Sequence, residues 1–368
     1  MRRLIAITEE SYSFREHERI VRMLRSNSFN YVHIRKPNMN ERDMREYLSR
    51  FPKDIRHLLC LNDHQELAKE YGIGGIHINS RFSFLTEETK GLRISKSCHS
   101  IEEAIESQDK YDYCFLSPIF DSISKKGYKS AFDHSEIRNL FQKNVLHDNV
   151  FALSGVTTEN IPYLEDMGFN GVAMLGAAWQ LPRMMFITHQ NERYSYIQSV
   201  KKSLSVGIKF LQLRMKDATD DEVMQVAEQI NPLCEQNNAI LTIDDRIELL
   251  ETGLFDGVHV GKNDMPLDEA KQITGKKFLL GATCNTIEDV ENAIKKGADY
   301  IGMGPYRFTT TKKNLAPILG LDGYKSVISK LKPQIPIYAI GGIEKTDIKL
   351  LREVGVYGVA VSSMLLRE

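Results

Sequence analysis

Short apolar runs alternate with amphipathic stretches along the second half of the chain. The stretches between them, such as 220–236, 286–297 and 345–355, carry apolar residues at three- and four-residue spacing, which predicts helices. Continuously apolar strands that alternate with helices predict a parallel sheet covered by helices. The predicted strands are 184–189, 208–214, 239–244, 257–261, 277–283, 299–304, 336–342 and 358–363.

Eight strand-helix units in order is the number found in a TIM (β/α)8 barrel. The alternative, an open doubly wound sheet, needs a glycine-rich turn after its first strand, and residues 187–196 contain no glycine. Little sequence follows the eighth strand, so we expect a short last helix. We expect the flank bared in this way to pack against the other half of the chain or against another subunit.

The first half of the chain repeats the second. Residues 151–175 match 338–362, residues 30–44 match 209–223, and residues 59–78 match 241–260. The repeat is as long as a domain, far longer than a solenoid repeat. The sequence therefore predicts an α/β protein of two tandem compact TIM barrels, with domains 1–181 and 182–368.

Composition narrows the function classes. The chain has 368 residues, 42% hydrophobic and 26% charged, with a net charge of −1, which gives no electrostatic basis for binding nucleic acid or an anionic membrane. No apolar run approaches the length that spans a bilayer. The five cysteines are scattered without CxxC spacing, which favours reduced thiols. We expect a cytoplasmic protein whose partners are small-molecule substrates.

Residues suited to phosphate and metal binding follow the predicted strands, where a TIM barrel carries its chemistry. Gln212, Arg214 and Lys216 alternate along one strand end and so share a face. Asp245 and Asp264 follow two neighbouring strands, and such a carboxylate pair suits Mg²⁺. The other candidates at strand ends are Asp244, Thr283, Thr309, Thr311, Lys312, Gly342, Ser362 and Ser363.

Each candidate also has an ordinary structural interpretation. An aspartate pair is often a helix cap, a Gly-Gly pair is often a turn, and His259 suits a hydrogen-bonded strand residue. The combination favours function, because residues of phosphate- or metal-binding type fall at seven strand ends. Together they indicate sites for two anions, a metal-bound diphosphate and a simple phosphate.

The motifs QLRMK, DDR, GVHVGKNDMP, GATCNT, DYIGMGPYRFTTTKK, AIGGI and GVAVSS resemble the thiamine-phosphate synthase family over residues 184–364. The resemblance implies a transferase that joins hydroxymethylpyrimidine diphosphate to thiazole phosphate and releases pyrophosphate. It implies Mg²⁺ on Asp245 and Asp264. It places Gln212 near the pyrimidine and Asp244 near the diphosphate. It assigns the diphosphate to Arg214, Lys216, Thr283 and Lys312, and the thiazole phosphate to Thr309, Thr311, Gly342, Ser362 and Ser363.

Of these residues, the resemblance makes Lys312, Arg214 and Thr283 the catalytic ones. Two positions depart from the family pattern: Asp244 stands where asparagine is usual, and Asn285 stands where histidine is usual. We expect both to alter rate or substrate preference without removing a metal ligand.

The first copy keeps only part of this set. His33 replaces Gln212, and Phe82 stands where Asp264 stands in the second copy. It resembles the related thiazole tautomerase group, although Pro118 occupies the usual histidine position of that group. His33 and His99 are then candidate proton carriers or ordinary histidines. The candidate site residues of this copy are Arg35, Asp63, Ser97, His99, Lys125 and Gly155.

For the first copy we rank a thiazole-phosphate-binding or tautomerase-like domain first, a structural partner barrel second and an active synthase third. For the whole chain, the leading interpretation is a synthase with an accessory barrel. A protein that binds thiamine-pathway phosphates without turnover is the alternative from another class. A third is another phosphate-binding barrel enzyme, such as an isomerase.

Overall fold

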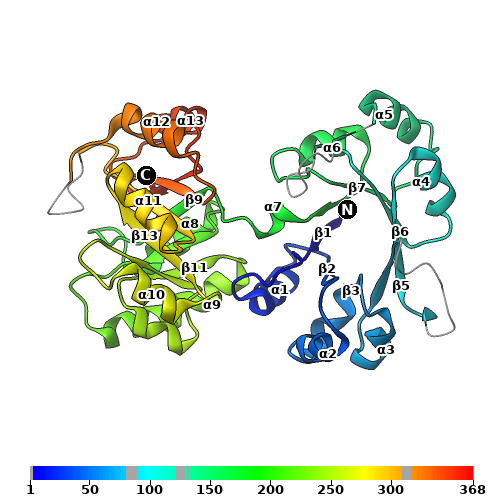
Figure 1. Cartoon of the computed structure of the whole chain (residues 1–368), viewed down its shortest axis with the longest axis horizontal. Coiled ribbons are helices and arrows are strands. Elements are labelled where there is room, and N and C mark those ends of the chain that lie inside the picture. The colour runs from blue at the N-terminus through cyan, green and yellow to red at the C-terminus, as the bar shows by residue number, and fades with distance from the viewer. Residues whose placement is uncertain (1–2, 80–88, 122–128, 131, 309–315, 368) are drawn as a thin grey trace. The chain divides into compact units, whose positions relative to one another are not determined.

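The computed structural model describes residues 3–79, 89–121, 129–130, 132–308 and 316–367. By its internal contacts the chain divides into two compact units, Met1–Gln180 and Leu181–Glu368. Each unit contains eight parallel strands that pair in sequence order and close into a barrel, the first strand pairing with the last. The predicted fold of two tandem TIM barrels is thus confirmed, and Figure 1 shows both rings with their helices outside.

The first unit follows the βα order that its apolar runs predict. Its elements are β1 (Arg3–Ile7), α1 (Glu16–Arg25), β2 (Tyr31–Ile34), α2 (Glu41–Ser49), η1 (Lys53–Leu58), β3 (Leu59–Leu61), η2 (Gln65–Leu67), α3 (Ala68–Tyr71), β4 (Gly75–Ile78), β5 (Arg93–Cys98), α4 (Ile101–Gln108), β6 (Tyr113–Leu116), α5 (His134–Gln142), β7 (Val150–Leu153), α6 (Ile161–Met167), β8 (Gly171–Met174) and α7 (Gly176–Trp179).

The second unit repeats this order. Its elements are β9 (Met184–Ile187), α8 (Tyr196–Ser205), β10 (Phe210–Leu213), α9 (Asp220–Gln236), β11 (Ile240–Asp244), η4 (Ile247–Thr252), β12 (Gly257–Val260), α10 (Leu267–Thr274), β13 (Leu279–Cys284), α11 (Ile287–Lys295), β14 (Tyr300–Met303), α12 (Gly320–Leu331), β15 (Ile337–Ile340), α13 (Lys345–Glu353), β16 (Gly358–Val361) and α14 (Ser363–Leu366). The last helices, α7 and α14, have four residues each, as predicted.

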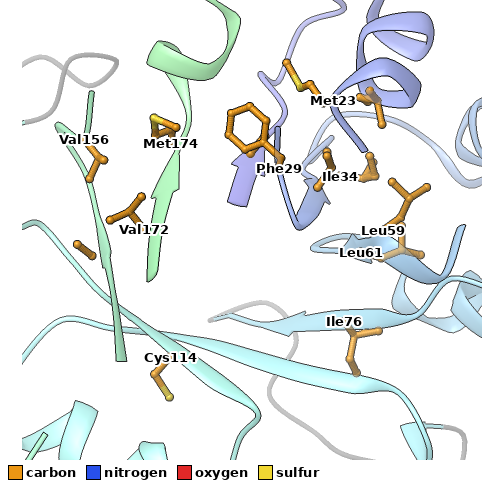
Figure 2. Close-up of a cluster of buried hydrophobic side chains, with 14 of the residues drawn as sticks. Met23, Phe29, Ile34, Leu59, Leu61, Ile76, Cys114, Val156, Val172 and Met174 are labelled. Carbon is orange, nitrogen blue, oxygen red and sulfur yellow. The ribbon is translucent and has the colours of Figure 1, made fainter. Parts of the chain in front are cut away.

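Alternate strand residues face opposite sides of each ring, as the strand period of two requires. In the first unit, Tyr113, Phe115 and Phe151 belong to a buried cluster separate from the larger one that includes Ile34 and Leu61. Figure 2 shows members of the larger cluster on successive strands and on the neighbouring helix segments. This burial fixes the register of the strands, and with it which side chains leave the strand ends toward the site.

Capping boxes fix where several helices of the second unit begin. The Thr219 side chain accepts from the Glu222 backbone, and the Glu222 side chain accepts in return at the start of α9. Thr286 and Asp289 form the same reciprocal pair at α11. These caps end the loops after β10 and β13 at defined residues, so these two loops are short. Among the helices of the described residues, none is long and apolar enough to cross a membrane.

Candidate active site

A cavity of about 560 Å³ opens at the carboxyl ends of the strands of the second unit. Its wall includes residues that follow each of the eight strands, from Thr188 after β9 to Ser362 after β16. A TIM barrel places its active site at this end. The cavity is therefore the candidate active site of this barrel.

The cavity brings together the predicted residues that the structure describes. Those in its wall are Gln212, Arg214, Lys216, Asp244, Asp245, Asp264, Thr283, Gly342, Ser362 and Ser363. Thr309, Thr311 and Lys312, including the predicted catalytic lysine, lie outside the described residues. Asn285, the departure from the usual histidine, also lines the cavity.

Three carboxylates form the acidic side of the cavity. The Gly261 backbone N–H donates to Asp264 Oδ2 at 2.6 Å, which turns this carboxylate toward Asp245. Asp245 has a left-handed backbone, with φ of 66°, directly after β11. Burial, a hydrogen bond to Asp264 and the charge of Asp244 together raise the pKa of Asp245 to about 7. Negative charge is therefore concentrated here beyond what the neighbouring cations offset.

This donor set fits a hard divalent cation with few protein ligands. Among the described residues no three His, Cys, Asp or Glu side chains are grouped so that they could hold a metal ion. Asp244 is engaged by Arg214, since its Oδ2 lies 3.2 Å from Arg214 Nε. Asp245 and Asp264 would supply two carboxylates, and water or substrate oxygens the rest of the shell, which is a usual arrangement for Mg²⁺.

Cationic side chains face the acidic group from β10. The Arg214 backbone N–H donates to Thr188 Oγ1 at 2.9 Å, which ties the end of β10 to that of β9. The Arg214 side chain is one-quarter exposed and contacts Asp244, while Gln212 Nε2 donates to the other oxygen of Asp244. Burial raises the pKa of Asp244, and Arg214 opposes that shift. The arginine is thus partly neutralised by Asp244, the residue at which the sequence resemblance led us to expect asparagine.

Two polar contacts fix the β13 end. His259 Nε2 lies 3.0 Å from Thr283 Oγ1, so this histidine is a hydrogen-bonded strand residue, as its ordinary interpretation predicts. Asn285 Nδ2 donates to the Gly304 carbonyl. His99 holds the matching place in the first barrel, where its Nδ1 lies 3.2 Å from the Ser117 carbonyl oxygen. Asn285 and His99 therefore make the same contact after matching strands.

The turn after β15 forms the opposite side of the cavity. Gly341 and Gly342 have φ of 93° and 66°, in the left-handed region that favours glycine. A Cβ on Gly342 would overlap Arg307 Cγ, so the turn packs directly on the loop after β14. Backbone N–H groups in such a turn can cradle an anion.

The diphosphate end of the first barrel is built differently. Arg35, the counterpart of Arg214, donates from Nη1 to Glu10 at 2.7 Å. Asp63 Oδ2 accepts from the Lys36 backbone N–H at 3.0 Å. The Lys36 side chain is fully buried and pairs with Glu16 at 3.0 Å, so it faces the helices and does not replace Lys216. Phe82 and Lys125 lie outside the described residues.

Buried histidines occupy the interior of the first barrel. His33 Nε2 lies 2.7 Å from Tyr113 Oη, and its Nδ1 lies 3.1 Å from Asn62 Oδ1. Burial lowers the pKa of His33 well below its usual value. The predicted Ser97 contacts His77 Nε2 at 2.9 Å, and Gly155 keeps a left-handed φ of 64°. The glycine turn is thus retained while Arg35 and Asp63 have partners of their own.

Sequence reasoning missed several residues of the cavity wall. Arg307 lies inside the motif DYIGMGPYRFTTTKK, yet neither its charge nor its spacing separates it from a solvated loop residue. Side chains that were not predicted also include His189, Lys262, Asn263 and Arg367. His189, Lys262 and Asn263 could have been found from their position at or directly after the ends of predicted strands.

The closed barrel and its cavity at the strand ends define the class, a TIM-barrel protein with a candidate site whose lining residues suit anions. The chain belongs to the thiamine monophosphate synthase family, whose model matches residues 4–178 and again 184–365. The predicted resemblance is confirmed, and the family is one of transferase enzymes.

Individual relatives match half of this chain. The thiamine-phosphate synthase of Bacteroides thetaiotaomicron is 50% identical over 187 residues, which cover 50% of this chain and 90% of the relative. That of Flavobacterium johnsoniae is 40% identical over 186 residues, covering 50% and 88%. The solved thiamine phosphate pyrophosphorylase from Pyrococcus furiosus is 32% identical, with a TM-score of 0.45, covering 49% of this chain and 85% of that one.

Proposed function

We propose that the second barrel couples hydroxymethylpyrimidine diphosphate with thiazole phosphate to give thiamine phosphate and pyrophosphate, with Mg²⁺ as cofactor. The observation that carries the proposal is one cavity with two groups of residues that suit anions. Carboxylates and Arg214 with Lys216 line one side, and the Gly341–Gly342 turn lines the other. The named activity of the relatives needs the same two anions.

The residues of the cavity suit a substitution more than acid-base chemistry. The bond between the pyrimidine methylene carbon and the diphosphate oxygen breaks, and the oxygen keeps the electron pair. The thiazole nitrogen then forms the new bond to the methylene carbon. Arg214 and Lys216 would bind the leaving diphosphate, and the glycine turn would hold the thiazole phosphate in line. Bound Mg²⁺ would stabilise the charge of the leaving group.

The direct test is to incubate the purified chain with both substrates and Mg²⁺ and to measure thiamine phosphate and pyrophosphate. Product that depends on Mg²⁺ and is lost in Asp264→Asn supports the proposal. Binding of thiazole phosphate without product supports the alternative of a non-catalytic binding protein. If no pyrophosphate is released and a monophosphate alone is converted, the result supports an isomerase.

For the first barrel we propose an accessory role, the binding of a thiazole phosphate with tautomerase-like chemistry. The retained Gly155 turn supports phosphate binding, and the Arg35–Glu10 pair argues against a diphosphate. The test uses the full chain with Asp264→Asn, so that the second barrel makes no product. Because the second barrel keeps its glycine turn in this variant, titration should count two thiazole phosphates bound per chain, and thiazole carboxylate phosphate should isomerise. A single bound thiazole phosphate without isomerisation would leave the first barrel a structural partner.

Two further expectations stay proposals. We propose a cytoplasmic location, since the composition favours reduced thiols, and the described cysteines are all buried and form no disulfide. We also propose that the flank left open by each short last helix is covered, within the chain or by another copy. Sedimentation equilibrium of the purified chain would show whether two chains associate.

A further inference from the structure

Arg307 joins three parts of the phosphate side of the second barrel. Its Nη1 and Nη2 donate to the two oxygens of Asp347 at 2.7 and 2.9 Å, a bidentate pair. The same Nη1 donates to the Gly342 carbonyl at 3.1 Å. Its backbone N–H donates to the Gly341 carbonyl at 3.0 Å. The carbonyl groups of both glycines are therefore held toward the β14 loop.

Asp347 completes this arrangement from α13. Its side chain is only 5% exposed, and its Oδ2 also accepts from the Glu344 backbone N–H at 2.8 Å. A carboxylate has no proton to donate, so Asp347 cannot hold the Gly342 carbonyl by itself. Arg307 supplies the missing donor. Because the guanidinium is already engaged by Asp347, Arg307 holds the turn and is not itself needed as a phosphate ligand.

The first barrel holds the matching glycine carbonyl with a different pair of residues. Phe120 stands where Arg307 stands, and Asn160 stands where Asp347 stands. Asn160 Oδ1 accepts from the Thr157 backbone N–H at 2.9 Å, and its Nδ2 donates to the Gly155 carbonyl at 2.8 Å. One amide thus does what the arginine and the carboxylate do together. Phe120 packs against Gly155 in place of the arginine stem.

We propose that Arg307 and Asp347 are positioning residues that act as one unit, fixing the Gly342 carbonyl so that the glycine turn presents N–H groups to a substrate phosphate. Arg307 and Asp347 can be replaced only together, by the phenylalanine and asparagine that the first barrel has at these two places. A carbonyl turned into the cavity would repel a phosphate, whereas an N–H attracts it. The inference rests on the proposed function for the identity of the phosphate substrate.

The test compares Arg307→Phe, Asp347→Asn and the double variant in the full chain. Loss of the charged donor in Arg307→Phe should raise KM for thiazole phosphate roughly tenfold. KM for the diphosphate substrate should not change, because its residues lie across the cavity. Adding Asp347→Asn should restore KM for thiazole phosphate to within about threefold of the parent, since the amide supplies the donor.

A further double variant separates positioning from simple stability. Arg307→Phe with Asp347→Ala also removes the buried charge but offers no donor to Gly342. It should regain thermal stability relative to Arg307→Phe, while KM for thiazole phosphate stays high. Lys296→Ala is the matched control, because it breaks a surface pair with Asp268 that is outside the cavity wall.

Calorimetric binding of thiazole phosphate by the same variants keeps the inference separate from turnover. If the parent chain makes no thiamine phosphate, the proposed function fails. The relative affinities of the variants for thiazole phosphate still test whether Arg307 and Asp347 act as one unit. Equal shifts in KM for both substrates, or no recovery with Asp347→Asn, would overturn the inference. The inference would also be overturned if Asp347→Ala restored KM for thiazole phosphate in Arg307→Phe as well as Asp347→Asn does.

Discussion

Arg214 Nε lies 3.2 Å from Asp244 Oδ2, so the arginine at the proposed diphosphate side is already paired within the chain. The Asp244 side chain is one-tenth exposed, and Gln212 holds its second oxygen. A buried pair of this kind keeps its geometry well, but it withholds charge from an incoming anion. The position that departs from the family pattern therefore bears directly on substrate affinity.

Replacing this aspartate should strengthen diphosphate binding. Asp244→Asn keeps one acceptor oxygen, enough for either Arg214 or Gln212, while it removes one negative charge beside the proposed substrate site. We expect KM for the diphosphate to fall roughly threefold to tenfold, about 0.7–1.4 kcal/mol, with KM for thiazole phosphate unchanged. Initial rates over both substrate concentrations measure this. A higher KM for the diphosphate would mean that Asp244 binds the metal or orients Arg214.

The two acidic sites distinguish the barrels. Asp264→Asn removes one of two carboxylates proposed for Mg²⁺, and we expect kcat to fall by roughly a hundredfold or more. Asp63→Asn in the first barrel should leave synthase turnover unchanged, because Asp63 accepts from the Lys36 backbone. Measured rates at saturating Mg²⁺ compare the two. An inactive Asp63→Asn beside an active Asp264→Asn would reverse the assignment of the barrels.

The fold was predictable because its signal is repeated sixteen times along the chain. An apolar run followed by a helical period marks each unit, and a closed parallel barrel is the arrangement that buries them. The face shared by Gln212, Arg214 and Lys216 was predictable from strand alternation for the same reason. Lys36 shows the same alternation from the opposite side. It lies one position before the place that matches Lys216, so its side chain is buried beside Glu16 and does not face the site.

The contacts that complete the site were not predictable, because they join residues far apart in sequence through side-chain reach. Arg307 meets Asp347 across 40 positions, and nothing local in either segment marks the pair. The shift of Arg35 onto Glu10 is equally hidden, since both residues suit a solvated loop. Comparison of the two copies shows which residues differ, but only coordinates show which differences compensate.

The buried histidines of the first barrel make its stability depend on pH. Burial lowers the pKa of His77 to about 3, against about 6.5 in an unfolded chain. The folded state therefore stays neutral where the unfolded state takes up a proton, and stability is lost as pH falls below about 6.5. Between pH 7 and pH 5 this histidine alone accounts for about 2 kcal/mol.

Denaturant unfolding at the two pH values measures the effect. His77→Gln should lower stability at pH 7 but flatten the loss between pH 7 and pH 5 by about 2 kcal/mol. His57→Gln, at an exposed position of the same barrel, is the control and should keep the parental slope. An unchanged slope in His77→Gln would show that His77 is not a buried neutral group.

The paired glycine turns offer a matched test of which barrel uses its phosphate subsite in synthesis. Gly342 and Gly155 have nearly the same φ, 66° and 64°, and a Cβ on either would overlap the loop that follows the sixth strand of its barrel. Alanine at each position should cost about 1–3 kcal/mol of stability from backbone strain. Only Gly342→Ala should also raise KM for thiazole phosphate, because its turn faces the cavity proposed to bind the diphosphate. Equal melting temperatures with unequal KM values would separate binding from folding, whereas a raised KM in Gly155→Ala alone would place the synthesis in the first barrel.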